Sequence, residues 1–521
     1  MGAVRKLAPG IMLLAILAGA FALRGWGSDF GLPAFTRYHP DEHALVDRAA
    51  AILWTGDWNL HLFNYPPFYA YLQTGAYATL FLWLAAQGFW SQVPSFTVPE
   101  YYHWGRLLTA AFGTLTVLVV YFMGRRLRTR RTGLLAAALL AGSYLHVIHS
   151  HYATFDVMVG FLASLTLLFS DLIRTDEKAK WYLLAGLSAG LAGATKYNGG
   201  VVVVIPLVAH VLAKRWDEWG LINGRLFLIP AGFLLGFFAG NPFALGNFTE
   251  FLNGLALVLH HYGTEQPGFE GTSNWRWYPT VFLTSADALW VVSGAVGLAG
   301  LMWRDWKRGL LLLVFPATYF VIVSSFVVRF ERNMVPLLPF LALGGAWLLD
   351  ASAGWVAGRL GRGQRSAGLL AAVGALIVLT LPLAAGISFD AAISGTDHRE
   401  VAGRWVEENV AGGSKIAIEH YAIPFDHGDY SVEDVLRISN HDLAWYQQEG
   451  FDVLIVSDGV WEVLRRAPEA YADKLAAYDK VASGSELLQE FVPRPPGIVV
   501  AGYPTVAVYH FAPVRIYQVP Q

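Results

Sequence analysis

Long apolar segments recur along most of this chain and alternate with short polar connections as far as about residue 387. Runs of roughly 17–25 apolar residues are long enough to cross a lipid bilayer as α-helices. The pattern therefore predicts about eleven membrane-spanning helices by that length criterion. They lie near residues 8–26, 104–123, 133–149, 155–173, 181–195, 200–213, 225–241, 280–302, 309–327, 333–357 and 367–387.

Two features interrupt this pattern. The short runs 181–195 and 200–213 are separated by Lys196-Tyr197-Asn198-Gly199-Gly200, which no continuous helix would contain. The two runs are either two full spans or a re-entrant pair, since broken helices at membrane depth are tolerated where they line a cavity. The long connection 27–103 holds two helical patterns, Ala44–Trp54 and a second that starts at Pro66-Pro67 and continues to about Phe89. We expect both to lie in the plane of the membrane interface.

Basic residues decide the predicted orientation. With alternating spans, every connection rich in Lys and Arg falls on the side of the N-terminus, which the positive-inside rule makes cytoplasmic. These residues are Arg125, Arg126, Arg128, Arg130 and Arg131, then Arg174, Lys178 and Lys180, then Lys214 and Arg215, then Arg304, Lys307 and Arg308, and finally Arg359, Arg362 and Arg365. The loop 27–103 and the C-terminus are then extracytoplasmic.

The segment 388–521 has the charge density of a soluble protein and no membrane-spanning run. Strand patterns at Lys415–Glu419, Phe451–Ser457 and Thr505–Phe511 alternate with helical patterns at His398–Asn409 and Ala467–Lys480. We therefore predict a membrane domain over residues 1–387 and a small extracytoplasmic α/β domain over residues 388–521. The latter contains no GxGxxG or P-loop nucleotide motif.

Composition narrows the function. The 521 residues are 55% hydrophobic and only 15% charged, with a net charge of -2, so no basic surface indicates nucleic acid binding. Cysteine is absent, which excludes disulfides and thiolate metal sites. Charged residues close to a membrane span are costly unless they face water, a partner or a substrate. The few that adjoin the spans are therefore the candidates for chemistry.

The first candidates are the adjacent carboxylates Asp41 and Glu42, flanked by His39 and His43. A carboxylate here can act as a general base toward an attacking hydroxyl group; equally, Asp and Glu favour the first turn of the following helix. Asp156, which enters an apolar run just after His149-Ser150-His151, can likewise be catalytic or cap its helix. The histidines and carboxylates do not have the spacing of a known metal motif, so a divalent metal is possible but not favoured.

Three cations lie on the face where positive charge is otherwise scarce: Lys196, Arg329 and Arg332. An anionic ligand such as a phosphate explains them, whereas snorkelling to lipid headgroups is the alternative. The loop that contains His261 and Tyr262 is rich in aromatic side chains, which either stack on sugars or anchor the chain at the interface.

Several segments together resemble the GT-C glycosyltransferases that use a polyprenyl-phosphate sugar, the group of protein O-mannosyltransferases and lipid A aminoarabinose transferases. The resemblance covers the membrane portion and the order of its motifs. The matching segments are His39-Pro40-Asp41-Glu42, Tyr65-Pro66-Pro67-Phe68-Tyr69, Arg106-Leu107-Leu108, Tyr152-Ala153-Thr154-Phe155-Asp156, Gly190-Leu191-Ala192-Gly193-Ala194-Thr195-Lys196-Tyr197 and Arg329-Phe330-Glu331-Arg332-Asn333-Met334-Val335-Pro336.

The resemblance implies an inverting transfer of a single sugar from a polyprenyl-phosphate carrier to a hydroxyl acceptor on the outer membrane face. By this resemblance, the family's catalytic base corresponds to Asp41 and its second acidic position to Asp156, and Glu42, next to Asp41, is also expected in the catalytic set. Lys196, Arg329 and Arg332 would contact the carrier phosphate. Arg106, His43, Tyr65, His151, His261 and Tyr262 complete the expected substrate-binding set. The chain departs from the aminoarabinose transferases at His43-Ala44-Leu45 and at Tyr65, so the acceptor stays open between lipid, glycan and protein.

Three other functions remain compatible with the residues. A transporter or flippase explains the spans and the broken helix but not the long outer loop or the C-terminal domain. A non-catalytic protein that binds the polyprenyl lipid would differ from the transferase only in that it does not transfer the sugar. An enzyme that resembles oligosaccharyltransferases would use a lipid diphosphate and a divalent metal. For the transferase we expect no cofactor, and the composition favours a bacterial plasma membrane.

Overall fold

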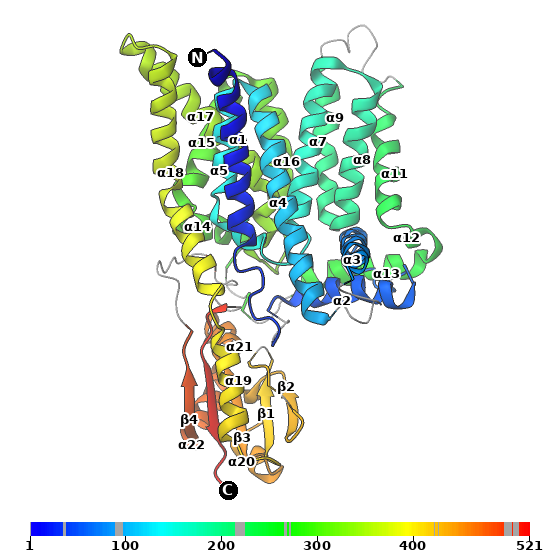
Figure 1. Cartoon of the computed structure of the whole chain (residues 1–521). Coiled ribbons are helices and arrows are strands. Elements are labelled where there is room, and N and C mark those ends of the chain that lie inside the picture. The colour runs from blue at the N-terminus through cyan, green and yellow to red at the C-terminus, as the bar shows by residue number, and fades with distance from the viewer. Residues whose placement is uncertain are drawn as a thin grey trace.

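The computed structural model describes residues 2–34, 38–88, 97–213, 224–264, 268–269, 272–420, 422–425, 427–493, 503 and 510–521. It shows a helical bundle joined to a smaller mixed domain, with the N-terminus at the end of the bundle farthest from that domain (Figure 1). Most helices of the bundle run side by side, while α2, α3 and α13 lie across its end next to the mixed domain (Figure 1).

The helices of the bundle follow one another in chain order and are connected mostly by short turns. They are α1 (Gly2–Gly25), α2 (Pro40–Thr55), α3 (Phe68–Ala86), α4 (Val98–Leu127), α5 (Arg130–Ala141), α6 (Tyr144–His149), α7 (Asp156–Asp176), α8 (Ala179–Thr195), the 3-10 helix η2 (Tyr197–Val203), α9 (Val204–Val211), α11 (Leu228–Gly240), α12 (Phe243–Gly246), α13 (Phe248–Gly263), α14 (Asn274–Thr284), α15 (Ala288–Arg304), α16 (Trp306–Ser324), the 3-10 helix η3 (Glu331–Leu337), α17 (Leu338–Arg359) and α18 (Gln364–Ile393).

Five helical segments of the described residues are long and apolar enough to cross a membrane, or up to six if α14 and α15, bent by 117° at their junction, count as one. The five are Val98–Leu127, Asp156–Asp176, Trp306–Ser324, Glu331–Arg359 and a segment that begins at Gln364. Shorter apolar helices lie beside them, among them Pro9–Gly25, Tyr197–Val211 and Leu228–Gly240. The multi-pass architecture is thus confirmed. The number of about eleven spans, which came from the lengths of the apolar runs in the sequence, remains a prediction.

The predicted break at Lys196 is present. Helix α8 ends at Thr195, Lys196 is extended, and the 3-10 helix η2 follows and leads directly into α9. A Cβ atom at Gly199 would lie 2.6 Å from the Ala192 carbonyl oxygen, so only glycine lets η2 pack against the last turn of α8. At Gly190 a Cβ would lie 2.0 Å from the Phe233 oxygen, which is how α8 and α11 approach so closely.

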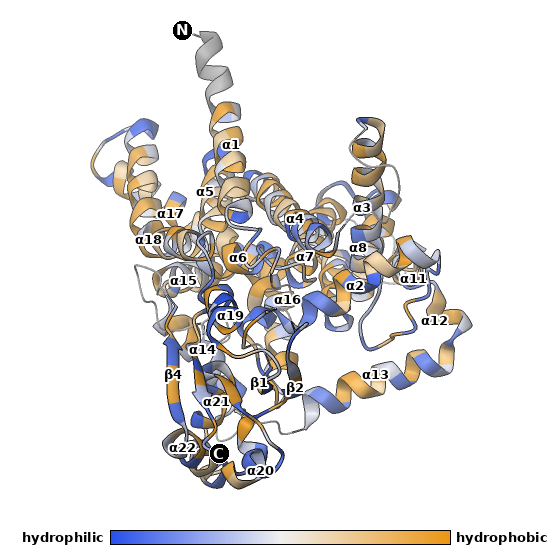
Figure 2. Cartoon of the chain, turned by 60° about the horizontal axis from the view of Figure 1, so that its bottom comes forward, coloured by the Kyte–Doolittle hydropathy of each residue, from blue (hydrophilic) through white to orange (hydrophobic). Residues whose placement is uncertain are grey.

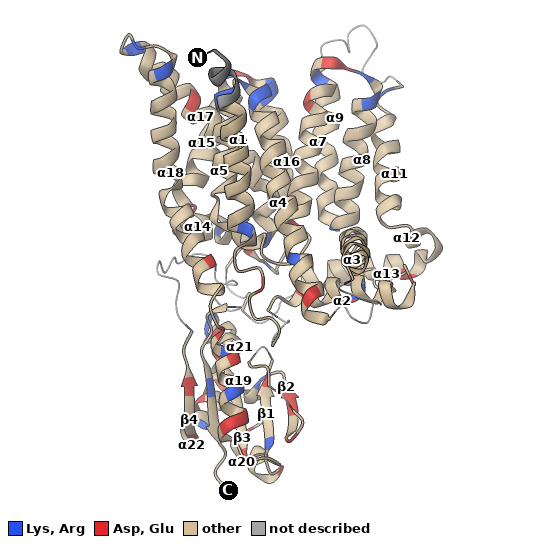
Figure 3. Cartoon of the chain, in the orientation of Figure 1, with Lys and Arg blue, Asp and Glu red and all other residues tan. Residues whose placement is uncertain are grey.

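Charges are distributed unevenly over the bundle. Lys and Arg gather at the end that holds the N-terminus (Figure 3). There Asp350 of α17 is paired with Arg128 at 3.1 Å and with Arg131. Of the predicted basic connections, Lys214 and Arg215 lie outside the described residues. The assignment of this end to the cytoplasm remains a prediction from the positive-inside rule.

Both predicted helices of the loop 27–103 are present, but α2 begins at Pro40, before the predicted Ala44, and α3 begins at Phe68, after the two prolines. Phe89 falls outside the described residues, and the location of both helices at a membrane interface remains a prediction. Helix α13 also lies across the end of the bundle, and its polar and apolar residues alternate along its length (Figure 2). None of its described side chains is fully buried. Such a helix matches the amphipathic type that lies at a membrane surface.

The mixed domain is built on one five-stranded sheet in the order β2-β1-β3-β5-β4. Strands β2, β1 and β3 are parallel to one another, and β5 is antiparallel to β3 and to β4. Helix α19 packs on one face and α20 to α22 on the other, so the domain has two small hydrophobic cores. The elements are α19 (His398–Asn409), β1 (Lys415–Glu419), β2 (Ser431–Val435), η4 (Ile438–Asn440), α20 (Leu443–Gln448), β3 (Val453–Ser457), α21 (Asp458–Arg465), α22 (Ala472–Gly484), β4 (Glu486–Phe491) and β5 (Val514–Gln518).

The sequence located α19, β1 and β3 closely, but its second helix, Ala467–Lys480, overlaps only part of α22, and α21 was not predicted. Its third strand, Thr505–Phe511, falls largely outside the described residues. The predicted boundary between residues 387 and 388 lies inside α18, which continues to Ile393 because Phe389 and Ile393 still pack against the bundle.

Candidate functional site

Asp41 occupies the first turn of α2, and the local sequence determines how it is presented. Pro40 begins the helix with a suitable backbone angle. His39 is the N-cap, and its Nδ1 accepts a hydrogen bond from the Asp41 backbone N–H at 3.1 Å. The Asp41 side chain is therefore held at the end of a rigid helix, and the residue is only 6% exposed.

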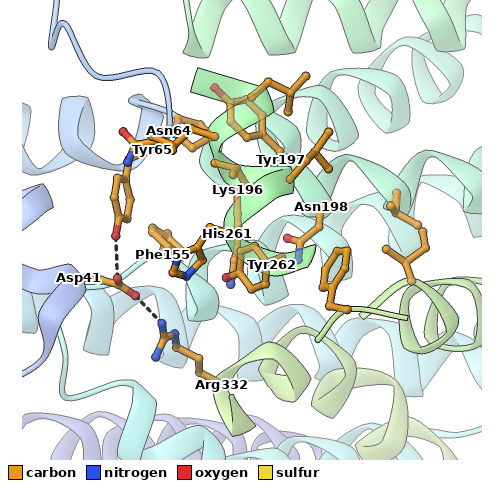
Figure 4. Close-up of a pocket in the computed structure, with 18 residues that line it drawn as sticks. Asp41, Asn64, Tyr65, Phe155, Lys196, Tyr197, Asn198, His261, Tyr262 and Arg332 are labelled. Carbon is orange, nitrogen blue, oxygen red and sulfur yellow. Dashed lines mark hydrogen bonds and ion pairs between the residues drawn. The ribbon is translucent and has the colours of Figure 1, made fainter. Parts of the chain in front are cut away.

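Two side chains from other elements bind the Asp41 carboxylate (Figure 4). Tyr65 donates its hydroxyl hydrogen to Oδ1 at 2.9 Å, and a guanidinium nitrogen of Arg332 lies 3.1 Å from Oδ2. Burial alone would raise the pKa of Asp41, but Arg332, with smaller contributions from His39 and Lys196, lowers that pKa to about 2. Burial also lowers the pKa of His39 to about 3, so at neutral pH the imidazole is uncharged and Asp41 is ionised.

Lys196 carries the second charge of the site and is positioned by the break after α8. Its Nζ donates to Asp156 Oδ1 at 2.8 Å and to Asn333 Oδ1 at 3.1 Å. Asp156 begins α7 and is fully buried, and its Oδ2 accepts no hydrogen bond from the described residues. The ammonium group also lies 5.0 Å from the centre of the Phe155 ring. The carboxylate of α7 thus holds the Lys196 ammonium group in place.

A cavity of about 490 Å³ opens between these groups. Its polar end is formed by Asp41, Lys196 and Arg332 (Figure 4). Its other walls come from α13, η2 and the end of α16 and are mostly apolar. The remaining lining residues are Asn64, Tyr65, Pro66, Phe155, Tyr197, Asn198, Val201, Leu255, Leu257, Val258, Leu259, His261, Tyr262, Ile322 and Phe326. The cavity therefore combines a charged end with a long apolar surface.

Six of the predicted site residues line this cavity together, although they come from five separate parts of the chain: Asp41, Tyr65, Lys196, His261, Tyr262 and Arg332. Asp156 lies directly behind Lys196. The remaining five are placed elsewhere, and their contacts indicate different roles.

Glu42 and Arg106 form a buried ion pair outside the cavity. Arg106 Nε lies 2.9 Å from Oε1 of Glu42, and a second guanidinium nitrogen lies 3.1 Å from Oε2. The Ala153 backbone N–H donates to the same carboxylate at 2.8 Å, and Arg106 also donates to the Phe30 carbonyl at 2.9 Å. Both charges are fully satisfied by the protein, so this pair joins α2, α4 and the segment before α7.

Arg329, His151 and His43 also lie outside the cavity lining. Arg329 donates to the carbonyl oxygens of Phe269 and Thr272 and so holds the segment before α14. His151 contacts backbone carbonyl oxygens with both ring nitrogens and lies 3.4 Å from Asp390. These contacts indicate that Arg329 and His151 stabilise the fold, whereas the sequence had placed both in the substrate-binding set. His43 is half-buried on α2.

Sequence reasoning missed five polar or aromatic residues of the cavity: Asn64, Phe155, Tyr197, Asn198 and Phe326. The first four lie beside or within segments quoted in the sequence analysis, which is the signal that could have found them. The apolar wall from α13 and α16 gave no such signal, since its leucines and phenylalanines are typical of any membrane helix.

Within the described ranges, no group of three or more His, Asp or Glu side chains is arranged to hold a metal ion. The expectation that the protein needs no metal is not tested by this finding and stays a prediction.

Comparison with known proteins supports the resemblance noted in the sequence. Residues 63–245 match the sequence profile of the dolichyl-phosphate-mannose-protein mannosyltransferase family. No curated protein matches the chain at the level of sequence. Among solved structures, ArnT from Cupriavidus metallidurans in the apo state is similar with a TM-score of 0.53 and 16% identity, covering 99% of this chain and 98% of ArnT.

A second similar structure is the oligosaccharyltransferase of Archaeoglobus fulgidus in its apo form, with a TM-score of 0.54 and 12% identity over 92% of this chain and 73% of that protein. Structures of both proteins with a lipid phosphate are also similar: ArnT bound to undecaprenyl phosphate, and AglB in complex with an inhibitory peptide and a dolichol-phosphate. The chain is therefore a multi-pass α-helical membrane protein with the GT-C glycosyltransferase fold and a small α/β domain at its C-terminus.

Proposed function

We propose that this protein is an inverting glycosyltransferase that moves a single sugar from a polyprenyl-phosphate carrier to a hydroxyl acceptor. The observation that carries the proposal is the cavity in which Asp41 faces Lys196 and Arg332 at one end of a long apolar surface. A sugar phosphate needs cations, an isoprenoid chain needs an apolar wall, and an attacking hydroxyl needs a base. The profile match and the two similar folds point the same way.

In the proposed reaction, the acceptor hydroxyl gives its proton to Asp41 as its oxygen attacks the anomeric carbon of the sugar. The bond between that carbon and the phosphate oxygen breaks, and the phosphate leaves with the electron pair. Lys196 and Arg332 stabilise the charge that develops on the phosphate. Attack from the side opposite the phosphate inverts the anomeric centre.

Arg332 has two partners in this scheme. Without a donor it pairs with Asp41 at 3.1 Å and lowers the pKa of that carboxyl group. A donor phosphate competes for the same guanidinium group, and weakening the ion pair makes the Asp41 carboxylate a stronger base. Donor binding thereby prepares the base, and Tyr65 keeps it oriented through the hydrogen bond to Oδ1.

We assign the other predicted residues to supporting roles. Asp156 positions Lys196, and the Glu42–Arg106 pair fixes α2 against α4. His261 and Tyr262 of α13 line the cavity, and we assign them contacts with the sugar or the first isoprene units. The donor is a hexosyl or pentosyl lipid phosphate, the acceptor a lipid, glycan or protein, and the reaction takes place on the extracytoplasmic face of a plasma membrane. No metal is needed.

Sugar transfer or release from a panel of radiolabelled polyprenyl-phosphate sugars tests the proposal, with the purified protein in detergent and lipid. Asp41→Asn should lower turnover by about 10²–10⁴, the usual contribution of a general base. Asp47→Asn is the matched control, because this exposed carboxylate lies on the same helix and bonds Tyr102 outside the cavity.

A chelator should leave the rate unchanged; a chelator-sensitive rate with a lipid diphosphate donor would instead favour an oligosaccharyltransferase-like reaction. Binding of labelled carrier without turnover of any donor would refute the enzyme and favour a transporter or a lipid-binding protein.

A further inference from the structure

The C-terminal domain contacts the two chain segments that carry the carboxylates of the site. Tyr38 directly precedes His39, the N-cap of α2, and Asp41 lies in the first turn of that helix. Tyr152 lies just before α7, which begins with Asp156. Both tyrosines are almost completely buried and bond to residues of the mixed domain. None of the described residues that line the cavity belongs to this domain, so any influence of the domain on the site has to pass through such contacts.

The first contact joins Tyr38 to the start of α19. The Tyr38 hydroxyl donates to Asp397 Oδ2 at 2.6 Å, and the Arg399 guanidinium group lies over the Tyr38 ring at 4.0 Å. Asp397 is itself fixed, because it accepts two hydrogen bonds from the Arg399 side chain at 3.0 and 3.1 Å. Tyr38 is therefore held by a rigid pair and not by a mobile surface side chain.

The second contact joins Tyr152 to His510. The Tyr152 hydroxyl and His510 Nε2 are 2.6 Å apart, and the His510 imidazole is stacked on the rings of both Tyr38 and Tyr152, at 5.2 and 5.7 Å. The Tyr152 ring also lies 4.9 Å from the ring of His39, the N-cap of α2. Burial lowers the pKa of His510, so it is a neutral hydrogen-bonding partner at physiological pH. One histidine of the C-terminal domain thus contacts both segments.

We propose that the C-terminal domain is a positioning element for the transfer reaction: through Asp397 and His510 it fixes the start of α2 relative to the start of α7. This inference rests on the proposed function, because it assigns the domain the task of setting the distance between Asp41 and the Lys196–Asp156 pair. Base and phosphate-binding groups must be held close to their productive geometry, and displacements of the order of 1 Å are costly.

Removing only the two hydroxyl groups tests the proposal. Tyr38→Phe and Tyr152→Phe keep the rings and their stacking, whereas the hydrogen bonds to Asp397 and His510 are lost. Each variant should lower kcat about three- to tenfold, the equivalent of one hydrogen bond, with the KM for the donor unchanged. A purely structural role would instead lower the amount of folded protein at constant kcat.

Tyr503→Phe is the matched control. Tyr503 is another buried tyrosine of the same domain, and its hydroxyl donates to Asp287 at 2.8 Å. Asp287 accepts hydrogen bonds from the backbone of Tyr144 and Leu145 at the start of α6, so this contact joins the two domains without touching either carboxylate segment. Its removal should leave kcat within about twofold of the unmodified protein, because no group of the site moves.

Hydrogen exchange gives a second readout that does not depend on turnover. In the double variant Tyr38→Phe/Tyr152→Phe, peptides that cover residues 38–47 and 150–158 should exchange faster, while Tyr503→Phe leaves both unchanged. Unchanged exchange in these peptides, or an equal fall in kcat for Tyr503→Phe, would overturn the proposal. If the unmodified protein turns over no donor, the proposed function fails, and the exchange rates still decide whether the domain positions these segments.

Discussion

Replacing Lys196 by Met separates the structural from the catalytic contribution of this buried cation. Lys196 and Asp156 are 7% and 0% exposed, and their charged atoms are 2.8 Å apart. At an effective dielectric constant of about 20, their attraction is about 6 kcal/mol before desolvation is subtracted. Lys196→Met keeps the side chain unbranched but leaves the Asp156 carboxylate buried without its counter-charge. Breaking a buried pair in this way costs about 3–5 kcal/mol.

The double variant Lys196→Met/Asp156→Leu removes both charges. Replacing a buried ion pair by apolar side chains is often nearly neutral, so most of the lost stability should return. Turnover should not return, because the leaving phosphate has lost a cation that contributes about 10²–10³ in rate. Recovered stability without recovered turnover is therefore the expected result.

Thermal unfolding followed by tryptophan fluorescence, together with donor turnover, measures the two effects on the same samples; the chain has 19 tryptophans. Lys178→Met is a matched control, since Lys178 forms an exposed pair with Asp176 at 3.1 Å. It should change stability by less than about 1 kcal/mol. A single Lys196→Met variant as stable as the unmodified protein would contradict the buried pair, and recovered turnover in the double variant would contradict the phosphate-binding role.

Two further predictions concern pH. Arg332→Gln removes the cation that lowers the pKa of Asp41 to about 2, so this pKa should rise by about one to two units. The acid limb of the kcat/KM profile should therefore move to higher pH. Arg329→Gln, the same change outside the cavity, should leave this limb in place, and equal shifts in both variants would refute the ion pair between Arg332 and Asp41. In the C-terminal domain, burial raises the pKa of Glu419 from 4.5 to about 7 despite its hydrogen bond from Tyr478. Because the folded state binds this proton more tightly, the domain should be most stable below about pH 4.5 and lose about 3 kcal/mol as the pH rises through 7. In melting curves of the full-length Glu419→Gln variant, the stability of the C-terminal domain should not fall as the pH rises through 7. A melting temperature of the unmodified protein that does not change with pH would contradict the raised pKa of Glu419.

The membrane architecture could be predicted because its causes are local. Apolar runs of membrane length, the glycines that interrupt them after Lys196, and the preference of Asp41 and Glu42 for the first turn of a helix are all properties of short segments. Span counting was less secure, since Gly142 and Ser143 break one predicted span into α5 and α6 and shorten both. Length alone cannot decide whether such pieces cross a membrane.

Candidate chemistry was predicted by a different argument, namely the cost of charge next to a membrane. That argument selects residues that must be paired or functional, and it cannot distinguish the two. Glu42 and Asp41 illustrate this, because adjacent positions of one helix turn point in different directions. Glu42 turns inward to Arg106, while Asp41 faces the cavity and Arg332. The sequence could not assign them separately.

Sequence patterns alone indicate the helical membrane domain, the α/β domain that follows it and a short set of charged residues from which the site is built. Which of these charged residues share a cavity becomes clear only when the chain is folded, since Asp41, Lys196 and Arg332 come from α2, the break after α8 and η3. The tertiary structure also shows that Tyr38 and Tyr152 are joined by His510, more than 350 residues away in the chain. The physical reason is that periodicity and the cost of buried charge act within one segment, whereas pairing depends on where packing brings distant segments together.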